Sequence, residues 1–273
     1  MLEIPESYTI AEQLNQTIQG KIISYVKANH SPHSFAWYFG NPADYDELLS
    51  GKTVGKSYAR AGMLEIEAEE CRIVLCDGAA PRYYDDLKKV PKKHQLYIEF
   101  DDNTALVCTI QMYGGLWAYR EGENHNGYYI GAREKPSPLS DVFDYNYFLI
   151  LRTDKAGKLS AKAFLATEQR IPGLGNGVLQ DILFVAGLHP KRKMDTVSEE
   201  EYRKLYDTVK ALLKQMSDQG GRDTEKDLFG NPGGYMTLLS KKTAWTPCTV
   251  CGYELRKDSY MGGTIYYCEH CQK

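Results

Sequence analysis

The stretch that decides the fold reads CTVCGYELRKDSYMGGTIYYCEHC and runs from residue 248 to residue 271. It holds two CxxC pairs, Cys248 with Cys251 and Cys268 with Cys271, separated by sixteen residues. Each pair brings two thiolates onto one turn, and two such turns can close a tetrahedron around zinc. The residues between the pairs predict a short hairpin that joins the turns. Because four thiolates leave no open coordination position, we expect a structural Zn²⁺ rather than a catalytic one.

A second informative stretch, IPGLGNGVLQDILFVAGLHP, lies upstream at residues 171–190. Its glycines, Gly173, Gly175 and Gly177, allow the backbone to approach a partner closely. Asn176 is predicted to cap the helix that follows. A helix start of this kind offers free amide groups to an anion, so the turn is a candidate phosphate site. The same pattern also fits a tight turn between two helices, and both interpretations stay open.

The remaining chain divides into a β-rich first part and a helical second part. Residues 5–19 predict a helix, and 198–216 predict a long helix that opens with a capping box of Ser198 and Glu201. Seven segments rich in aromatic and alternating apolar residues predict strands, at 21–26, 34–39, 62–68, 71–76, 95–100, 105–113 and 115–120. We therefore predict an α+β fold with an N-terminal β-sandwich, a leading helix, a C-terminal helical domain and the four-cysteine zinc finger.

Turn-forming residues between 121 and 142, including Pro136 and Pro138, mark the change from strands to helices. They give four predicted regions. Residues 1–125 form the sandwich, 126–142 a linker, 143–240 the helical domain and 241–273 the zinc finger.

Composition excludes several classes of protein. The 273 residues carry a net charge of −3 and contain no apolar run long enough to cross a membrane. The start, MLEIPESYTI, has early acidic residues and no apolar signal core, so we expect a cytoplasmic protein. We also expect a monomer. The first 150 residues hold 14 Lys and Arg against 21 Asp and Glu, whereas the rest hold 19 against 15. The basic second part could therefore bind phosphates although the whole chain is acidic.

The order of these parts resembles the formamidopyrimidine-DNA glycosylase/endonuclease VIII family over the whole chain. The start reads MLEIPE (1–6), the first half is rich in strands, GLGN (173–176) precedes a helix, and the paired CxxC motifs end in CQK. The resemblance implies a helix–two-turns–helix element in the C-terminal domain, and duplex DNA, expected to be damaged, in a cleft between the domains. It also implies that a damaged base is extruded from the stack before reaction, as part of DNA repair at the nucleoid.

The family's nucleophile is the amine of an N-terminal proline, and the adjacent glutamate handles protons. Here Leu2 stands in place of that proline, while Glu3 and Glu6 match the family pattern. The amine of Met1 lies one residue away from the expected nucleophile and is the candidate replacement. We therefore expect the Schiff-base step, and with it abasic-site lyase activity, to be weak or absent.

Two cations of the family pattern are also missing. Gly62 aligns with a lysine of a β-hairpin, and Gly263 aligns with the hairpin arginine that holds the phosphate flanking the lesion. The Arg-Phe wedge that fills the space of the extruded base becomes Met112 and Tyr113, and Tyr113 could still stack on a base. Gly175 and Asn176 remain as candidate DNA contacts.

Two further segments are candidates for DNA recognition. The glycine-rich stretch 220–235 corresponds to the family's base-capping loop, and a mobile surface loop is the alternative. Lys241 and Lys242 are expected to face phosphate, unless they only form a solvated surface. The residues of the loop that could read a base edge are Arg222, Asp223, Thr224 and Glu225.

Three hypotheses follow. In the first, the protein is a DNA glycosylase in which Glu3 acts as general base on a water molecule. In the second, it binds damaged or distorted DNA without catalysis. In the third, the scaffold has lost DNA binding and serves as a protein-interaction module.

Overall fold

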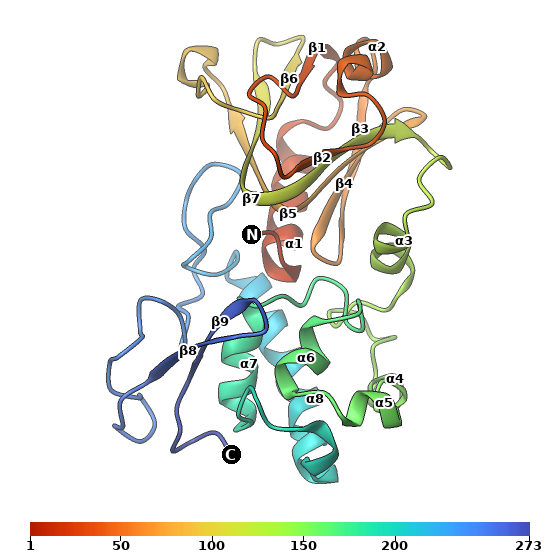
Figure 1. Ribbon diagram of the computed structural model, residues 1–273. Helices are drawn as coiled ribbons and strands as arrows, with labels where there is room; N and C mark the ends of the chain where they lie inside the picture. The colour runs from red at the N-terminus through yellow and green to blue at the C-terminus, as the bar shows by residue number, and fades with distance from the viewer.

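The computed structural model describes all residues, 1–273, and has two lobes (Figure 1). The strands β1 to β7 and helix α1 form one lobe, and helices α4 to α8 with the hairpin β8–β9 form the other. The N-terminus lies at the junction of the lobes. This arrangement confirms the predicted α+β fold with a leading helix and a helical C-terminal part.

Helix α1 (Ile4–Thr17) begins with Pro5 in its first turn, where a missing backbone N–H is tolerated. Ile10 and Leu14 are buried on one face of the helix. That face joins the core of 27 buried residues in the N-terminal lobe, so α1 closes one side of the sheet. The prediction for residues 5–19 is therefore confirmed to within two residues at each end.

Seven strands form one continuously hydrogen-bonded sheet, with the order β1-β6-β7-β5-β4-β3 and with β2 beside β7. Two of them are long, since β5 has 14 residues and β7 has 16, and they pair along most of their length. The strand bounds are Ile23–Ala28, Ala36–Tyr38, Val54–Arg60, Met63–Ala68, Cys71–Tyr84, Leu96–Phe100 and Ala105–Arg120, from β1 to β7.

The division of residues 105–120 into two predicted strands is wrong, because β7 runs through Gly114 without ending. The register with β5 shifts between Asp77 and Ala79, opposite Gly114. A Cβ on Gly114 would lie 2.8 Å from the Ala79 nitrogen, so glycine permits the close approach of the two strands. The sequence prediction also missed strand β3 and the short helix α2 (Tyr45–Leu49).

The C-terminal lobe packs its helices around a second core of 25 buried residues. Helix α8 begins after Ser198, whose hydroxyl accepts from Glu201 N while the Glu201 carboxylate accepts from Ser198 N, which confirms the predicted capping box. The helix bounds are Tyr145–Ile150 for α4, Asp154–Gly157 for α5, Ala161–Ala166 for α6, Val178–Ala186 for α7 and Glu199–Asp218 for α8. Short 3-10 helices span Pro42–Asp44, Leu87–Lys89 and Met194–Thr196.

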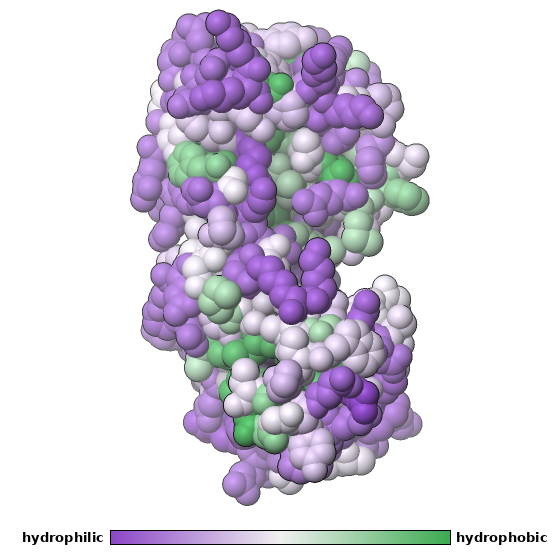
Figure 2. All heavy atoms as spheres, turned by 90° about the vertical axis from the view of Figure 1, so that its left-hand side faces the viewer, coloured by the Kyte–Doolittle hydropathy of each residue, from purple (hydrophilic) through white to green (hydrophobic).

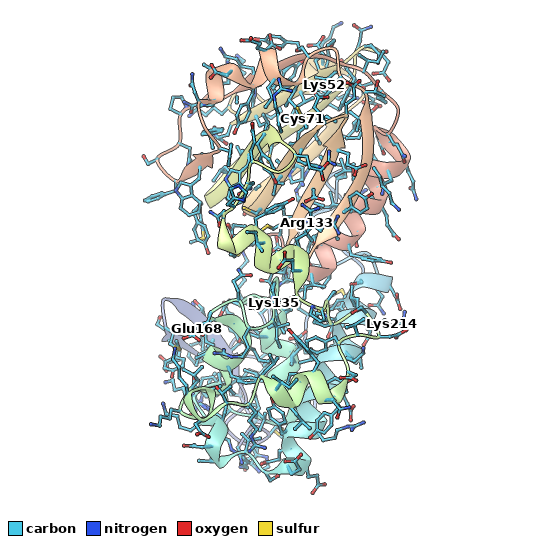
Figure 3. The ribbon with its side chains drawn as sticks, turned by 90° about the vertical axis from the view of Figure 1, so that its right-hand side faces the viewer. Lys52, Cys71, Arg133, Lys135, Glu168 and Lys214 are labelled. Atoms are coloured by element: carbon cyan, nitrogen blue, oxygen red, sulfur yellow. The ribbon has the colours of Figure 1, made fainter.

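The segment predicted as a linker, 126–142, contains helix α3 (Gly127–Glu134), which begins after an Asn126 side-chain cap. Figure 3 shows Arg133 beside the N-terminal lobe and Lys135 beside the C-terminal lobe. Arg133 lies 3.8 Å from the Glu121 carboxylate, and Lys135 Nζ donates to the Gln169 carbonyl at 2.5 Å. The segment is therefore attached to both lobes. No helix of the structure is long and apolar enough to span a membrane.

Candidate functional site

The surface is hollowed between the two lobes (Figure 2), and two cavities lie at this junction. One, of about 710 Å³, is lined by Glu3, Tyr113 and the turn that carries Asn176. The other, of about 420 Å³, is lined by Glu6 and by the loop that follows α8. Met1 and Leu2 line both cavities, so the N-terminus stands between them.

Glu3 is buried at the N-terminus of helix α7. Its two carboxylate oxygens accept from Gly177 N at 2.9 Å and Val178 N at 2.8 Å. A carboxylate at this end of a helix satisfies free amides and interacts favourably with the helix dipole. A Cβ on Gly175 would lie 2.7 Å from Glu3 Cδ, so the glycine is required for this approach.

The prediction that Asn176 caps this helix is wrong. The capping residue of α7 is Gly177, and no local side chain caps it, because the Glu3 carboxylate takes that position. Asn176 instead donates from Nδ2 to the Thr264 carbonyl of the hairpin at 2.9 Å. The turn is thereby tied to both the N-terminus and the four-cysteine hairpin. Because the Glu3 carboxylate already accepts from Gly177 N and Val178 N, these amides are not free for a phosphate, and this part of the phosphate-site prediction is wrong.

Arg222 joins the two carboxylates of the MLEIPE motif in a buried ion cluster. Its Nε and Nη2 donate to the two oxygens of Glu6 at 2.9 and 2.8 Å, and Nη1 lies 3.6 Å from Glu3. All three side chains are at most 5% exposed. A Cβ on Gly177 would lie only 1.6 Å from Arg222 Nη1, so the guanidinium occupies space that exists because residue 177 is glycine.

Within this cluster the pKa values of the Glu3 and Glu6 carboxyls shift in opposite directions. Burial raises the pKa of the Glu3 carboxyl above its ordinary value, although Arg222 acts in the opposite direction. Burial acts in the same way on Glu6, but there the bidentate Arg222 guanidinium prevails and the pKa of that carboxyl is lowered. Paired carboxyls with divergent pKa values are typical of acid–base sites.

The amine of Met1 does not lie free in the cavity. It forms an ion pair with Glu225 Oε2 at 2.5 Å, and Glu225 and Thr224 line the smaller cavity. Of the four residues predicted to read a base, Arg222 is committed to Glu6, and Asp223 pairs with Lys242 at 2.6 Å. Lys241 is exposed, forms no ion pair and lines the smaller cavity.

The two glycines predicted to stand in place of family cations, Gly62 and Gly263, have close neighbours. A Cβ on Gly62 would lie 3.0 Å from Gly173 Cα, so the hairpin tip packs closely against the GLGN turn, and a larger side chain there would require the turn to shift. A Cβ on Gly263 would lie 3.1 Å from Lys162 Nζ and 3.5 Å from the Asn176 amide. At both positions another part of the chain therefore lies close to the point where a side chain would begin.

Met112 and Tyr113 lie on β7 at the wall of the larger cavity. Met112 is 64% exposed, and the Tyr113 ring lies 5.7 Å from the Trp37 ring. An exposed apolar side chain beside paired aromatic rings offers a surface on which a base could stack.

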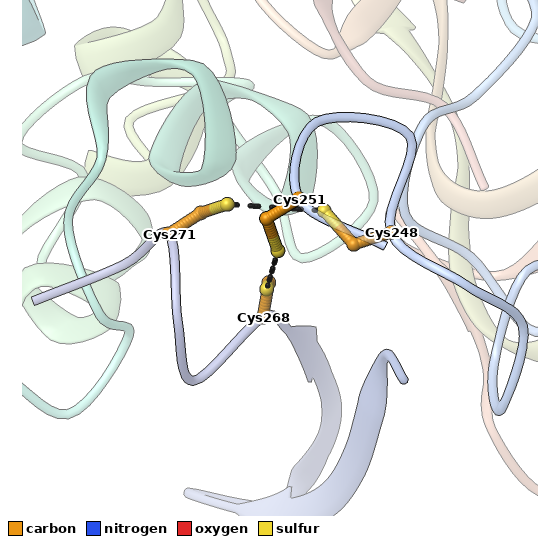
Figure 4. Close-up of side chains that lie close together, drawn as sticks. All are labelled: Cys248, Cys251, Cys268 and Cys271. Atoms are coloured by element: carbon orange, nitrogen blue, oxygen red, sulfur yellow. Dashed lines mark hydrogen bonds between the residues drawn. The ribbon is translucent and has the colours of Figure 1, made fainter. Parts of the chain in front are cut away.

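The side chains of the four cysteines converge, as Figure 4 shows. Their sulfur atoms all lie within 4.8 Å of one another, with Cys251 and Cys268 at 3.4 Å and Cys248 and Cys271 at 3.8 Å. A tetrahedral zinc with Zn–S bonds of about 2.3 Å places its sulfurs about 3.8 Å apart, so the geometry fits such an ion. The hairpin between the pairs consists of β8 (Arg256–Tyr260) and β9 (Gly263–Tyr267).

Sequence reasoning missed Lys162, which lines the larger cavity although it is only 5% exposed. It lies on α6 between two alanines, and no spacing or motif distinguishes it. Only the packing of α6 against the hairpin brings it to the site.

The chain is similar in sequence to known DNA glycosylases. Residues 135–226 match the family model "Formamidopyrimidine-DNA glycosylase H2TH domain". Formamidopyrimidine-DNA glycosylases of Marinobacter nauticus and Cronobacter sakazakii share 27% and 28% identity with the chain, over the full length of both partners.

Solved structures agree in fold. The MutM (Fpg) protein of Thermus thermophilus superposes with a TM-score of 0.82 at 24% identity, covering 99% of this chain and 98% of that one. Lactococcus lactis Fpg, solved with DNA containing an abasic site, gives 0.84 at 22% identity and covers 99% of each chain. The chain is therefore similar over its whole length to formamidopyrimidine-DNA glycosylases, and residues 135–226 carry the H2TH domain of that family.

Proposed function

We propose that this protein is a DNA-repair glycosylase that acts on a damaged base extruded from duplex DNA. The observation that carries the proposal is the meeting of Glu3, the N-terminus and the Asn176 turn in the cavity between the lobes. The full-length relatives named formamidopyrimidine-DNA glycosylases support it. So does the cavity size, since the extruded base needs a pocket of its own.

Glu3 is the proposed general base. Its raised pKa leaves the carboxyl partly protonated at lower pH and ionised as the pH rises. Base release that depends on the ionised form must therefore increase as the pH rises through this pKa. Water activated by Glu3 would attack C1′ of the sugar while the bond from C1′ to the base breaks, and the released base would take up a proton. No covalent intermediate with the protein is required.

Lyase activity is proposed to be weak or absent. Leu2 stands at the position where the family has its proline, and the Met1 amine forms an ion pair with Glu225. An ammonium group in an ion pair is a poor nucleophile, because it must first lose its proton and its partner. Strand cleavage would therefore lag behind base release.

A second candidate is a non-catalytic binder of damaged or distorted DNA. The favouring observation is that both Glu3 oxygens already accept backbone amides, with Arg222 beside them. In this form the carboxylate would serve only to hold α7 against the N-terminus. Lesion binding without base release would identify this candidate.

For the four-cysteine site we propose a structural Zn²⁺. Four sulfur ligands close the coordination shell, so the ion would hold the hairpin and supply no chemistry to the reaction. The hairpin then stands beside Asn176, where it can contact the DNA backbone. Duplex DNA is the proposed partner, and the protein is proposed to act as a monomer.

The testing experiment measures duplex binding and base release together. Duplexes carrying an oxidised purine, an oxidised pyrimidine, an alkylated base, uracil or an abasic site are compared with an intact duplex. We expect tighter binding to at least one lesion duplex and release of its base. Equal, salt-insensitive affinity for all duplexes, with no release, would contradict both candidates.

A further inference from the structure

Lys162 is a buried cation without a counter-ion. It is 5% exposed, it has no carboxylate within 4.0 Å, and its single hydrogen bond is from Nζ to the Tyr260 carbonyl at 2.6 Å. The other buried Arg, Asp and Glu side chains are satisfied: five have an ionic partner, and Asp181 accepts two backbone amides. An unpaired buried charge is costly, and its persistence points to an anionic partner.

The position of this amine is informative. A Cβ built on Gly263 would lie 3.1 Å from Lys162 Nζ, so the amine lies where a hairpin side chain at 263 would begin. The same Cβ would lie 3.5 Å from Asn176 Oδ1, a buried oxygen that has no hydrogen-bond partner. The unpaired cation therefore lies on the wall of the larger cavity. The Asn176 oxygen can only accept hydrogen bonds, so Lys162 supplies the donors for an anion at this point.

We propose that Lys162, beside Asn176, binds a backbone phosphate of the DNA, so that α6 supplies the cation that Gly263 lacks. The inference rests on the proposed function, because it assumes that DNA lies in the cavity. Two of the three ammonium protons of Lys162 are free to bond phosphate oxygens. Among the residues that line this cavity, Lys162 is the one Lys or Arg.

Local packing holds the amine in place. Ser160 caps α6 through a hydrogen bond from Ala163 N at 3.2 Å, and Lys162 N donates to the Pro190 carbonyl at 3.0 Å. The lysine stem is buried between this helix and the hairpin. Since the amine is already largely desolvated in the free protein, its own share of the desolvation cost of phosphate binding is small.

The test uses Lys162→Met, which keeps a buried stem, in the full-length zinc-loaded protein. Binding to a short duplex with a tetrahydrofuran abasic analogue is followed by fluorescence anisotropy between about 50 and 200 mM salt. Lys214→Met is the matched control, because it removes one charge from an exposed lysine that pairs with Asp218 on α8 (Figure 3). Zinc content and thermal unfolding establish that each variant is folded.

We expect Lys162→Met to weaken binding about ten- to hundredfold, the loss of one charged hydrogen-bonding contact. The slope of log affinity against log salt should fall by about 0.9, while the control stays unchanged. Adding Gly263→Arg to Lys162→Met should restore the slope, because the arginine would start where the amine has been removed.

Three outcomes would overturn the inference. A folded Lys162→Met protein with the wild-type slope would limit Lys162 to holding Tyr260. Weaker binding that Gly263→Arg does not rescue would have the same meaning. In both cases wild-type lesion binding would stand, and the proposed function with it. If the wild type itself shows no salt-sensitive binding, the proposed function and the inference fail together.

Discussion

The four-cysteine hairpin and the Glu3 cluster are both small polar sites, but the chain builds them in opposite ways. The four sulfurs come from 24 consecutive residues, 248–271. Glu3 reaches Gly177 across 174 positions of sequence, and Glu6 reaches Arg222 across 216. The first site depends on local spacing, whereas the second exists only when the two lobes are assembled.

The two sites are also stabilised by different interactions. The hairpin depends on metal–sulfur bonds, so loss of one ligand or of the ion can remove it. The Glu3 cluster depends on burial of charges that must stay paired, so any change that unpairs one of them is penalised. Variants of the two sites should therefore fail in different ways.

The largest effect is expected from loss of the metal. Cys268→Ala, or a chelator, should unfold the hairpin and abolish DNA binding, because structural zinc contributes about 10–16 kcal/mol in finger peptides. Metal analysis of the purified wild type should give one zinc per chain. Cys108→Ala, a buried cysteine outside the site, is the control and should keep its zinc. Full zinc content in Cys268→Ala would contradict the assigned ligands.

Arg222→Met should have the next largest effect. It leaves Glu3 and Glu6 buried without their cation, which should lower the free energy of unfolding by about 3–5 kcal/mol. Arg256→Met removes an exposed pair with Glu254 and should cost about 0–1 kcal/mol. Denaturant unfolding measures both. Equal losses would mean that the buried cluster adds nothing beyond a surface ion pair.

Gly177→Ala tests the space that Arg222 occupies. The added methyl would lie 1.6 Å from Arg222 Nη1, so the guanidinium must move, and a loss of about 1–3 kcal/mol is expected. Gly131→Ala in α3 meets nothing within 4 Å and should instead stabilise by about 0.5–1 kcal/mol. A neutral Gly177→Ala would show that Arg222 can leave Glu3 freely.

The smallest effect concerns Lys241 and Lys242. Lys241→Ala should reduce the salt dependence of DNA binding by about one unit of slope. Lys242→Ala should change it less, because Asp223 already pairs with Lys242 at 2.6 Å. Anisotropy titrations at several salt concentrations compare the two variants. A larger change in slope for Lys242→Ala than for Lys241→Ala would mean that Lys242, and not Lys241, contacts the DNA phosphate.

The features that could be predicted from the sequence are those that depend on local spacing, and contacts between distant parts of the chain could not be predicted. The cysteine ligands, the capping box of α8 and the leading helix depend on local spacing, and the sequence predicted all three. The cap of α7 was wrong, because a carboxylate from the other end of the chain takes the place of Asn176. Strand β7 was divided at Gly114, since a glycine within a long paired strand has the same local pattern as a turn.

Lys162 and Arg222 show why the rest could not be predicted. No pattern in the sequence distinguishes Lys162. Arg222 is expected from the sequence to read a base edge, and nothing in the sequence indicates that it pairs with Glu6 instead. Their roles depend on the glycines at 263 and 177, which make room for side chains that arrive from other helices and loops. An absent side chain gives no local signal of what will fill its space.

The central claim is that Glu3 releases a base without a covalent amine intermediate. The most direct measurement compares wild type and Glu3→Gln for base release on the preferred lesion duplex, with borohydride present to trap any Schiff base. The account predicts release by the wild type that increases with pH, loss of release in Glu3→Gln with lesion binding retained, and no trapped complex. Trapping by the wild type, or unchanged release by Glu3→Gln, would contradict it.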